Sequence, residues 1–106
     1  MDQPIMKRQP STLLSRNLVQ LLISSGTARK YSRGTTIFEE GDLSDALYVL
    51  VEGQLKVYTR DEKGRELVFN TISPGEVFGE LFLDGGARSA SVRALIDSSC
   101  VVIDEE

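Results

Sequence analysis

The spacing of apolar residues changes once along this chain, near residue 27. Before that point four leucines fall at i, i+4, i+7 and i+8, which places them on one stripe of a helix: Leu14, Leu18, Leu21 and Leu22. Ser11 or Thr12 can cap the start of this helix, and the Ser-Ser-Gly run at 24–26 is expected to end it. Residues 1–10 are polar and include two prolines, which is typical of a disordered tail. The pattern therefore predicts a tail over 1–10 and an N-terminal helix over 11–26.

From Thr27 onward, short β-rich runs alternate with glycines. Glycine recurs at intervals of 7 to 12 residues, and the runs between are TTIF, ALYVLV, QLKVYT and RELVFNTI, followed by SVRALI and CVVI. In the run QLKVYT, Leu55, Val57 and Thr59 alternate with Gln54, Lys56 and Tyr58. This alternation is typical of a strand with one face toward solvent. The turn DEKG is expected to join it to RELVFNTI as a hairpin. Regular turns with such strands favour a mainly β sandwich or barrel of about eight strands over 27–106.

The composition narrows the classes of function. The chain has 106 residues, enough for one small domain, and a formal net charge of −4. This acidic balance argues against nucleic-acid binding by this chain, because phosphate binding needs a basic face. The chain contains no histidine, which excludes histidine metal sites and Ser-His-Asp or Cys-His catalysis. We therefore expect no metal and no enzymatic activity.

The single cysteine and the absence of long apolar runs indicate the compartment. Cys100 lies in the apolar run CVVI, where a buried, inert thiol is expected, and one cysteine cannot form an internal disulfide. No run approaches the length of a membrane span, and the first residues lack the apolar core of a signal peptide. These features predict a cytoplasmic protein that does not interact with membranes.

The segment FGELFLDGGARSAS, residues 78–91, concentrates the candidate chemistry. Glu80 and Arg88 can pair with each other as a structural salt bridge. They can also hold a small ligand that is anionic at one end and rich in hydroxyls at the other, because an arginine binds phosphate oxygens and a carboxylate accepts from ribose hydroxyls. Gly79 allows close approach of the backbone, and a short helical turn near Glu80 would aim N–H groups at the anion.

Three segments resemble one family: RGTTIFEEGDLSDALYVLVEGQLKVY, then PGEVFGEL, then RSASVRA. The chain, from about Ala28 to Asp104, is similar to cyclic nucleotide-binding domains, which occur in catabolite-activator-type bacterial regulators, kinase regulatory subunits and some ion channels. The resemblance implies a double-stranded β-roll, a jelly-roll-like barrel, with an N-terminal helix and a short helical turn in the phosphate-binding cassette. RSASVRA resembles the bacterial transcription-regulator branch.

The resemblance also implies roles for residues. Glu80 would bind the ribose, Arg88 the phosphate, and Ser89 would add its N–H and hydroxyl to the phosphate. The ligand would be cAMP or cGMP. The sugar-phosphate would also contact Gly79 and the backbone of Leu81 and Phe82. The base would lie against Val57 and Phe69, with Asn70 at its edge. Val57 and Phe69 can instead be plain core.

The sequence departs from the family pattern in the cassette and at its end. Leu81 runs directly into Phe82, so Glu80 and Arg88 are one residue closer than is commonest in the family. A phosphate hydrogen bond lost in this way would cost about 1.5–3 kcal/mol. The chain also stops near the last expected strand, without the lid helix and DNA-binding domain that follow in the family. We therefore expect a segment of a longer protein rather than a natural minimal domain.

The hypothesis is a non-catalytic cyclic nucleotide sensor, most simply for cAMP, from a bacterial transcription regulator that dimerises and binds DNA through the missing domain. One alternative is a β-roll that senses another effector or none. Others are the regulatory domain of a channel or kinase, and a barrel enzyme, which the lack of histidine disfavours.

Overall fold

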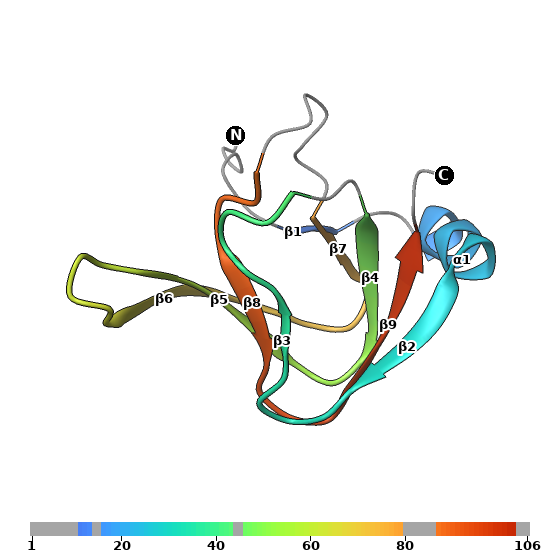
Figure 1. Ribbon diagram of the computed structural model, residues 1–106. Coiled ribbons are helices and arrows are strands. Elements are labelled where there is room, and N and C mark those ends of the chain that lie inside the picture. Colours follow the sequence, from blue (N-terminus) through green and yellow to red (C-terminus); the bar gives the residue numbers. More distant parts are fainter. Residues whose placement is uncertain (1–10, 14–15, 44–45, 80–86, 104–106) are drawn as a thin grey trace, which may run out of the picture.

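The computed structural model describes residues 11–13, 16–43, 46–79 and 87–103. One helix and nine strands lie within these ranges (Figure 1). The elements are β1 (Ser11–Leu13), α1 (Arg16–Ser25), β2 (Thr27–Tyr31), β3 (Thr36–Phe38), β4 (Leu47–Glu52), β5 (Leu55–Arg60), β6 (Glu66–Ile72), β7 (Glu76–Phe78), β8 (Ser91–Ala94) and β9 (Ser98–Ile103).

The strands form two sheets that face each other across the core (Figure 1). One sheet has the order β1-β7-β4-β9-β2 and the other the order β3-β8-β5-β6. Every strand pairing among the described residues is antiparallel. Neighbours in a sheet are mostly distant in sequence, so the chain crosses repeatedly between the sheets, as in a jelly roll. The predicted mainly β roll is confirmed.

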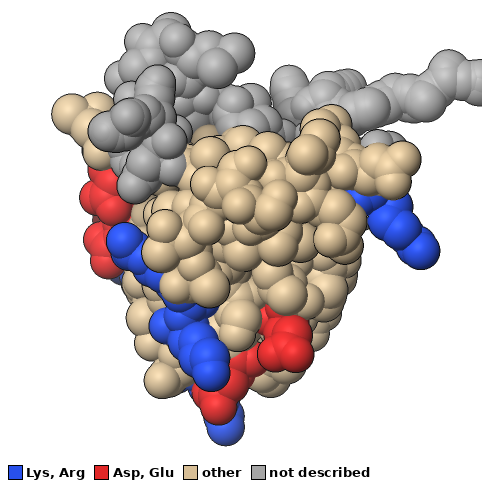
Figure 2. All heavy atoms as spheres, turned by 90° about the vertical axis from the view of Figure 1, so that its right-hand side faces the viewer, with Lys and Arg blue, Asp and Glu red and all other residues tan. Residues whose placement is uncertain are grey.

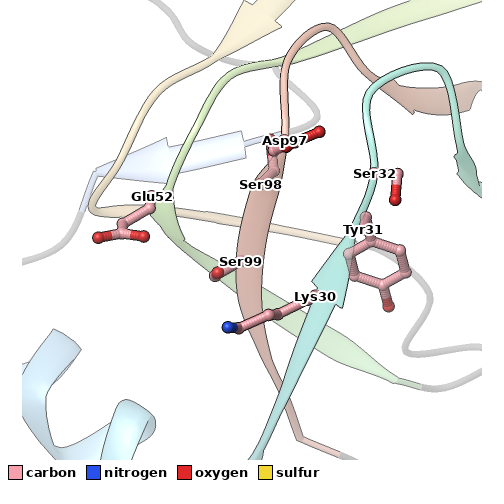
Figure 3. A pocket seen from close by; sticks show the side chains of 7 residues that line it. All are labelled: Lys30, Tyr31, Ser32, Glu52, Asp97, Ser98 and Ser99. Carbon is pink, nitrogen blue, oxygen red and sulfur yellow. The ribbon is translucent and has the colours of Figure 1, made fainter.

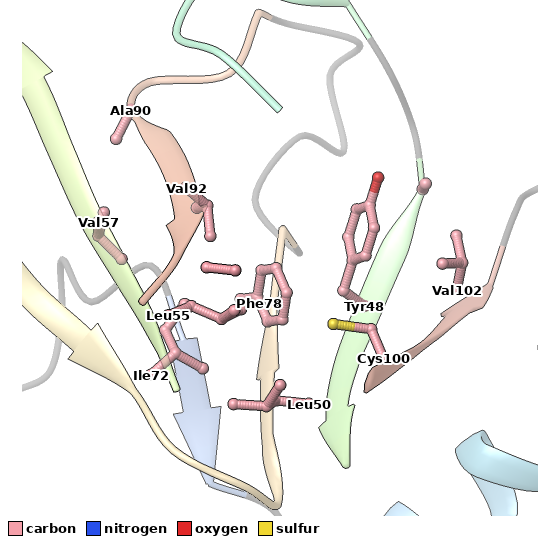
Figure 4. Packing of buried hydrophobic residues seen from close by; sticks show 12 residues of the cluster. Tyr48, Leu50, Leu55, Val57, Ile72, Phe78, Ala90, Val92, Cys100 and Val102 are labelled. Carbon is pink, nitrogen blue, oxygen red and sulfur yellow. The ribbon is translucent and has the colours of Figure 1, made fainter. Parts of the chain in front are cut away.

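Apolar side chains from both sheets fill the space between them (Figure 4). Leu55 and Val57 point inward from β5, while Lys56 between them is half-buried on the other face. Leu50 and Phe78 meet them from the opposite sheet. Cys100 is 0% exposed in this core, and burial raises the pKa of its thiol to about 12. The predicted buried thiol is confirmed.

The helix packs on the outside of the larger sheet, and of the predicted leucine stripe only Leu22 takes part among the described side chains. Val19 is its buried residue and contacts Val49 and Val77, with Leu22 and Ile23 partly buried beside it. Leu18 and Leu21, which belong to the predicted leucine stripe, are 44% and 63% exposed. The contact is narrow because the helix touches the sheet through positions i, i+3 and i+4 only.

The helix also begins later than predicted. Residues Ser11–Leu13 form β1, which pairs with β7, and α1 begins at Arg16. The reason is tertiary: β7 pairs with β4 on one side only, and β1 supplies backbone partners to its other side. The residue types at 11 and 12 favour a helix cap locally, but they do not show that these residues pair with a strand more than sixty residues away. The predicted tail over 1–10 lies outside the described residues.

The predicted hairpin is present as β5 and β6, which extend away from the roll (Figure 1). Its turn is closed by hydrogen bonds from the Gly64 N–H to the Asp61 carbonyl (2.9 Å) and from the Asp61 N–H to the Arg65 carbonyl (3.0 Å). The register shifts between Val57 and Tyr58, so that one residue of β6, Phe69, is bulged out of the pairing.

Tyr58 shares the outer face of β5 with Lys56, as the alternation predicts, but only 2% of it is exposed. Three cations cover its ring: the guanidinium of Arg93 is 4.6 Å from the ring centroid, and Lys56 and Arg60 are each at 5.4 Å. The carboxylate of Glu66 joins them, at 2.7 Å from Arg93 and 2.9 Å from Lys56. These hydrogen bonds, that from Arg93 first, lower the pKa of Glu66 to about 2. This cluster on the outer face of the smaller sheet was not predicted.

Candidate ligand-binding site

Arg88 is the buried charged residue at the centre of the candidate site, with 2% of its surface exposed. Its guanidinium donates from Nη1 to the carbonyl oxygen of Gly79 and from Nη2 to that of Ala46, each at 2.9 Å. Its backbone is also fixed, since its N–H donates to the Asp42 carbonyl (2.8 Å) and its carbonyl accepts from the Gly41 N–H (2.9 Å). The side chain of Arg88 therefore joins the end of β7 to the start of β4, and its backbone joins both to the loop after β3.

A cluster of aromatic rings supports the same guanidinium. Its central carbon lies over the Phe38 ring at 4.3 Å from the centroid, and 5.9 Å from that of Tyr48. The rings also contact one another: Tyr48 stacks on Phe78 at 5.0 Å, and Phe38 lies 5.6 Å from Tyr48 and 6.2 Å from Phe78. Aromatic faces attract a cation without carrying a formal negative charge. Among the described residues, aromatic rings and backbone carbonyls thus surround this permanent positive charge.

Gly79 is required at its position by both conformation and space. Its φ is +82°, in the left-handed region, and a Cβ there would lie 2.9 Å from Nη1 of Arg88 and 3.2 Å from the Ala46 carbonyl oxygen. The sequence predicts a glycine that permits close approach to a sugar. The described residues show that it permits close approach of the arginine.

The other cassette residues divide between described and undescribed parts of the chain. Ser89 is exposed next to the buried Arg88. Glu80, Leu81 and Phe82 lie outside the described residues, as do the shortened loop and the expected helical turn. The proposed contacts of these residues with ribose and phosphate therefore stay predictions.

The residues predicted to face the base lie together on the β5–β6 hairpin but differ in burial. Val57 is 0% exposed in the core and is the register partner of Asn70, which is half-buried. Phe69 is 54% exposed at the bulge. Val57 is therefore a core residue, whereas Phe69 is not. A role of either residue in base binding stays a prediction.

A separate polar hollow lies at the opposite end of the larger sheet, where β2, β4 and β9 meet (Figure 3). Its volume is about 300 Å³. None of the predicted site residues lines it; the lining residues are Lys30, Tyr31, Ser32, Glu52, Asp97, Ser98 and Ser99. On the face with α1 and β2, basic side chains lie interspersed with acidic ones instead of forming one basic surface (Figure 2).

Two further properties of the described residues bear on function. No group of three or more His, Cys, Asp and Glu side chains among them is arranged to hold a metal ion. Within the same ranges, no helix has the length and apolar character needed to cross a bilayer.

The family model for the cyclic nucleotide-binding domain matches residues 28–106. The chain belongs to this family. The match begins within β2 and includes the three segments that carry the resemblance, whereas β1 and α1 precede it.

Relatives of this cyclic nucleotide-binding domain include bacterial regulators. It is 37% identical over 89 residues to the cyclic AMP receptor protein of Thermus thermophilus, covering 83% of this chain and 41% of that protein. It is 34% identical over 77 residues to a CRP-like cAMP-activated global transcriptional regulator of Mycobacterium tuberculosis, covering 72% of this chain and 34% of that protein. The crystal structure of the Thermus thermophilus catabolite activator protein superposes with a TM-score of 0.75 at 36% identity, covering 86% of this chain and 43% of that one. This domain thus spans less than half the length of these relatives.

Only some of the residues around the Arg88 guanidinium could be predicted from the sequence. Gly79 and Arg88 were predicted as site residues, and the structure brings them into contact. Phe38, Ala46 and Tyr48 were not singled out, although Ala46 accepts a hydrogen bond from the guanidinium and the two rings lie beside it. They lie in the β-rich runs TTIF and ALYVLV, whose pattern indicates strands and carries no signal for a partner at residue 88.

Proposed function

We propose that this domain is a non-catalytic sensor of a cyclic nucleotide, cAMP first, and that it forms the regulatory part of a bacterial transcription regulator. The observation that carries the proposal is the buried guanidinium of Arg88, fixed between two backbone carbonyls and an aromatic ring, within the cassette of a cyclic nucleotide-binding domain.

The chemistry of this site suits a phosphodiester. A guanidinium presents its N–H donors in a rigid plane that matches the geometry of phosphate oxygens, and its charge is permanent. Burial beside aromatic rings makes its attraction to an anion stronger than it would be in water. Fixing the donor before the ligand arrives also reduces the entropy lost on binding.

The burial of Arg88 bears on mechanism. At 2% exposure the guanidinium cannot meet a phosphate unless the atoms that now cover it move. Binding would therefore be coupled to rearrangement around residue 88, and a ligand that binds only the rearranged form shifts the population toward it. In the longer protein this shift would bias a following helix, and dimerisation and DNA binding would depend on parts beyond this domain.

The names of relatives favour cAMP. The Thermus protein is named a cyclic AMP receptor protein, and the Mycobacterium protein a cAMP-activated transcriptional regulator. Binding of cGMP, of another effector or of none, and a parent channel or kinase, are the competing outcomes. No turnover of the cyclic phosphate is expected, since the proposed role of Arg88 is to bind charge and an arginine does not serve as a general base.

The test is titration of the 106-residue domain with cAMP and cGMP by calorimetry, with amide signals of Gly79, Glu80 and Ser89 followed by NMR. Arg88→Lys keeps the charge but loses the planar fork, and should weaken binding by one to two decades, as expected for about 1.5–3 kcal/mol of charged hydrogen bonding. The matched control is Arg93→Lys, which alters an arginine that contacts Glu66 on the outer face instead. Absence of heat and of shifts with either nucleotide at millimolar concentration, in a folded domain, would exclude the proposal.

A further inference from the structure

The arrangement around Arg88 raises the question of what fixes its orientation. The two hydrogen bonds to Gly79 and Ala46 lie in the plane of the guanidinium, because its N–H groups do. Bonds in the plane leave rotation and displacement out of the plane weakly restrained. The Phe38 ring, 4.3 Å from the guanidinium carbon, restrains this remaining direction more closely than the Tyr48 ring, whose centroid is at 5.9 Å.

A β-bulge in β3 turns the Phe38 ring toward Arg88. Thr36 pairs with Arg93, but Phe38 pairs with Val92 instead of Ser91, so the strand has one extra residue, Ile37. Arg93 belongs to the outer-face cluster around Glu66, whereas Val92 is 1% exposed in the core. In a regular strand Phe38 would share the outer face with Thr36. The bulge moves it to the inner side, where it meets Arg88.

The nature of the contact also matters for an anion site. A carboxylate partner, such as Glu66 at 2.7 Å from Arg93, satisfies an arginine by neutralising it. A ring attracts the cation through its quadrupole and adds no negative charge that would repel a phosphate. An aromatic support therefore orients the guanidinium without itself neutralising the charge.

We propose that Phe38 is a positioning residue for ligand binding: its ring, turned inward by the β3 bulge, holds the Arg88 guanidinium in the orientation that receives the phosphate. The proposal rests on the proposed function of Arg88 as the phosphate ligand. It assigns a role to a residue outside the cassette and contributed by the other sheet from Gly79.

The test compares ring-removing with ring-keeping substitutions in the 106-residue domain. Phe38→Leu should raise the dissociation constant for cAMP by about 3- to 30-fold, the range that corresponds to the strength of cation–π contacts. Phe38→Tyr, which keeps the ring, should bind within about 3-fold of the unmodified domain. Phe38→Met is the second ring-removing variant if Phe38→Leu does not fold. Ile37→Ala is the matched control, because Ile37 packs against the same core from the same bulge.

Two further measurements distinguish a loss of guanidinium orientation from a general loosening of the binding site. Adenosine, which lacks the phosphate, should bind all the folded variants equally, so the cAMP-to-adenosine ratio should fall only where the ring is lost. The Nε–H signal of Arg88, assigned by its disappearance in Arg88→Lys, should lose its ring-current shift in Phe38→Leu and keep it in Phe38→Tyr. If the unmodified domain binds no cyclic nucleotide, the proposed function fails and this inference falls with it. If it binds and the folded Leu or Met variant keeps the cAMP-to-adenosine ratio, the positioning role alone is wrong.

Discussion

Substitution of Gly79 by alanine tests how the site is built. The residue has φ +82°, and a non-glycine residue in the left-handed region costs about 1–2 kcal/mol. In addition, the new Cβ would lie 2.9 Å from Nη1 of Arg88, 3.2 Å from the Ala46 carbonyl oxygen and 3.3 Å from Cδ1 of Tyr48. Two of these neighbours belong to backbone or to a packed ring, so the guanidinium is the group that has to move.

The magnitude follows from adding the two effects. Displacement of the guanidinium breaks or weakens the 2.9 Å bond to the Gly79 carbonyl, and a hydrogen bond to a charged group contributes about 1.5–3 kcal/mol. Together with the backbone strain, Gly79→Ala should lower the free energy of unfolding by about 2.5–5 kcal/mol. That is a large fraction of the stability of a small domain.

Gly64→Ala is the matched control for this experiment. Gly64 has nearly the same φ, +84°, at the hairpin turn, but a Cβ there meets nothing within 4 Å. It should therefore cost only the strain, about 1–2 kcal/mol. Urea unfolding followed by circular dichroism gives both values. Equal losses in the two variants would show that the close approach of Gly79 to Arg88 contributes nothing to stability.

Two further predictions concern pH, each with its own measurement. The cations around Glu66 lower the pKa of its carboxyl from 4.5 to about 2, so this stabilisation is fully present above pH 4.5 and is lost as the pH falls through 2. Unfolding curves should show that Glu66→Gln removes this acid dependence and that Glu62→Gln, at the exposed hairpin turn, does not; equal curves for both would contradict the role of the cluster. Burial raises the pKa of Cys100 from 9.0 to about 12, so stability should fall as the pH rises from 9 towards 12, because only the unfolded chain releases the thiol proton there. Cys100→Ala should remove that alkaline component, and rapid reaction of the native thiol with a disulfide reagent at pH 8 would show that it is not buried.

Features of the fold that depend on neighbouring residues were predicted correctly, whereas features that depend on distant contacts were not. The hairpin was predicted correctly because a turn sequence and an alternating strand pattern are both short-range features. The start of the helix was wrong because pairing with β7 overrides a local capping preference at residues 11–13. The predicted leucine stripe was only partly right, because Val19, Leu22 and Ile23 pack against the larger sheet whereas Leu18 and Leu21 are exposed.

The same distinction holds at the candidate site. Residue type and spacing alone indicated a mainly β sandwich or barrel, a buried Cys100, and Gly79 and Arg88 in one segment, and the resemblance to a family added the β-roll. Only the tertiary structure decided that Arg88 points into a cluster of rings and carbonyls from β3, β4 and β7. It also decided that a bulge turns Phe38 inward and that three cations cover Tyr58. These contacts join residues far apart in sequence, and their geometry depends on which strands pair and on where a bulge interrupts the pairing, neither of which a local pattern of apolar and polar residues specifies.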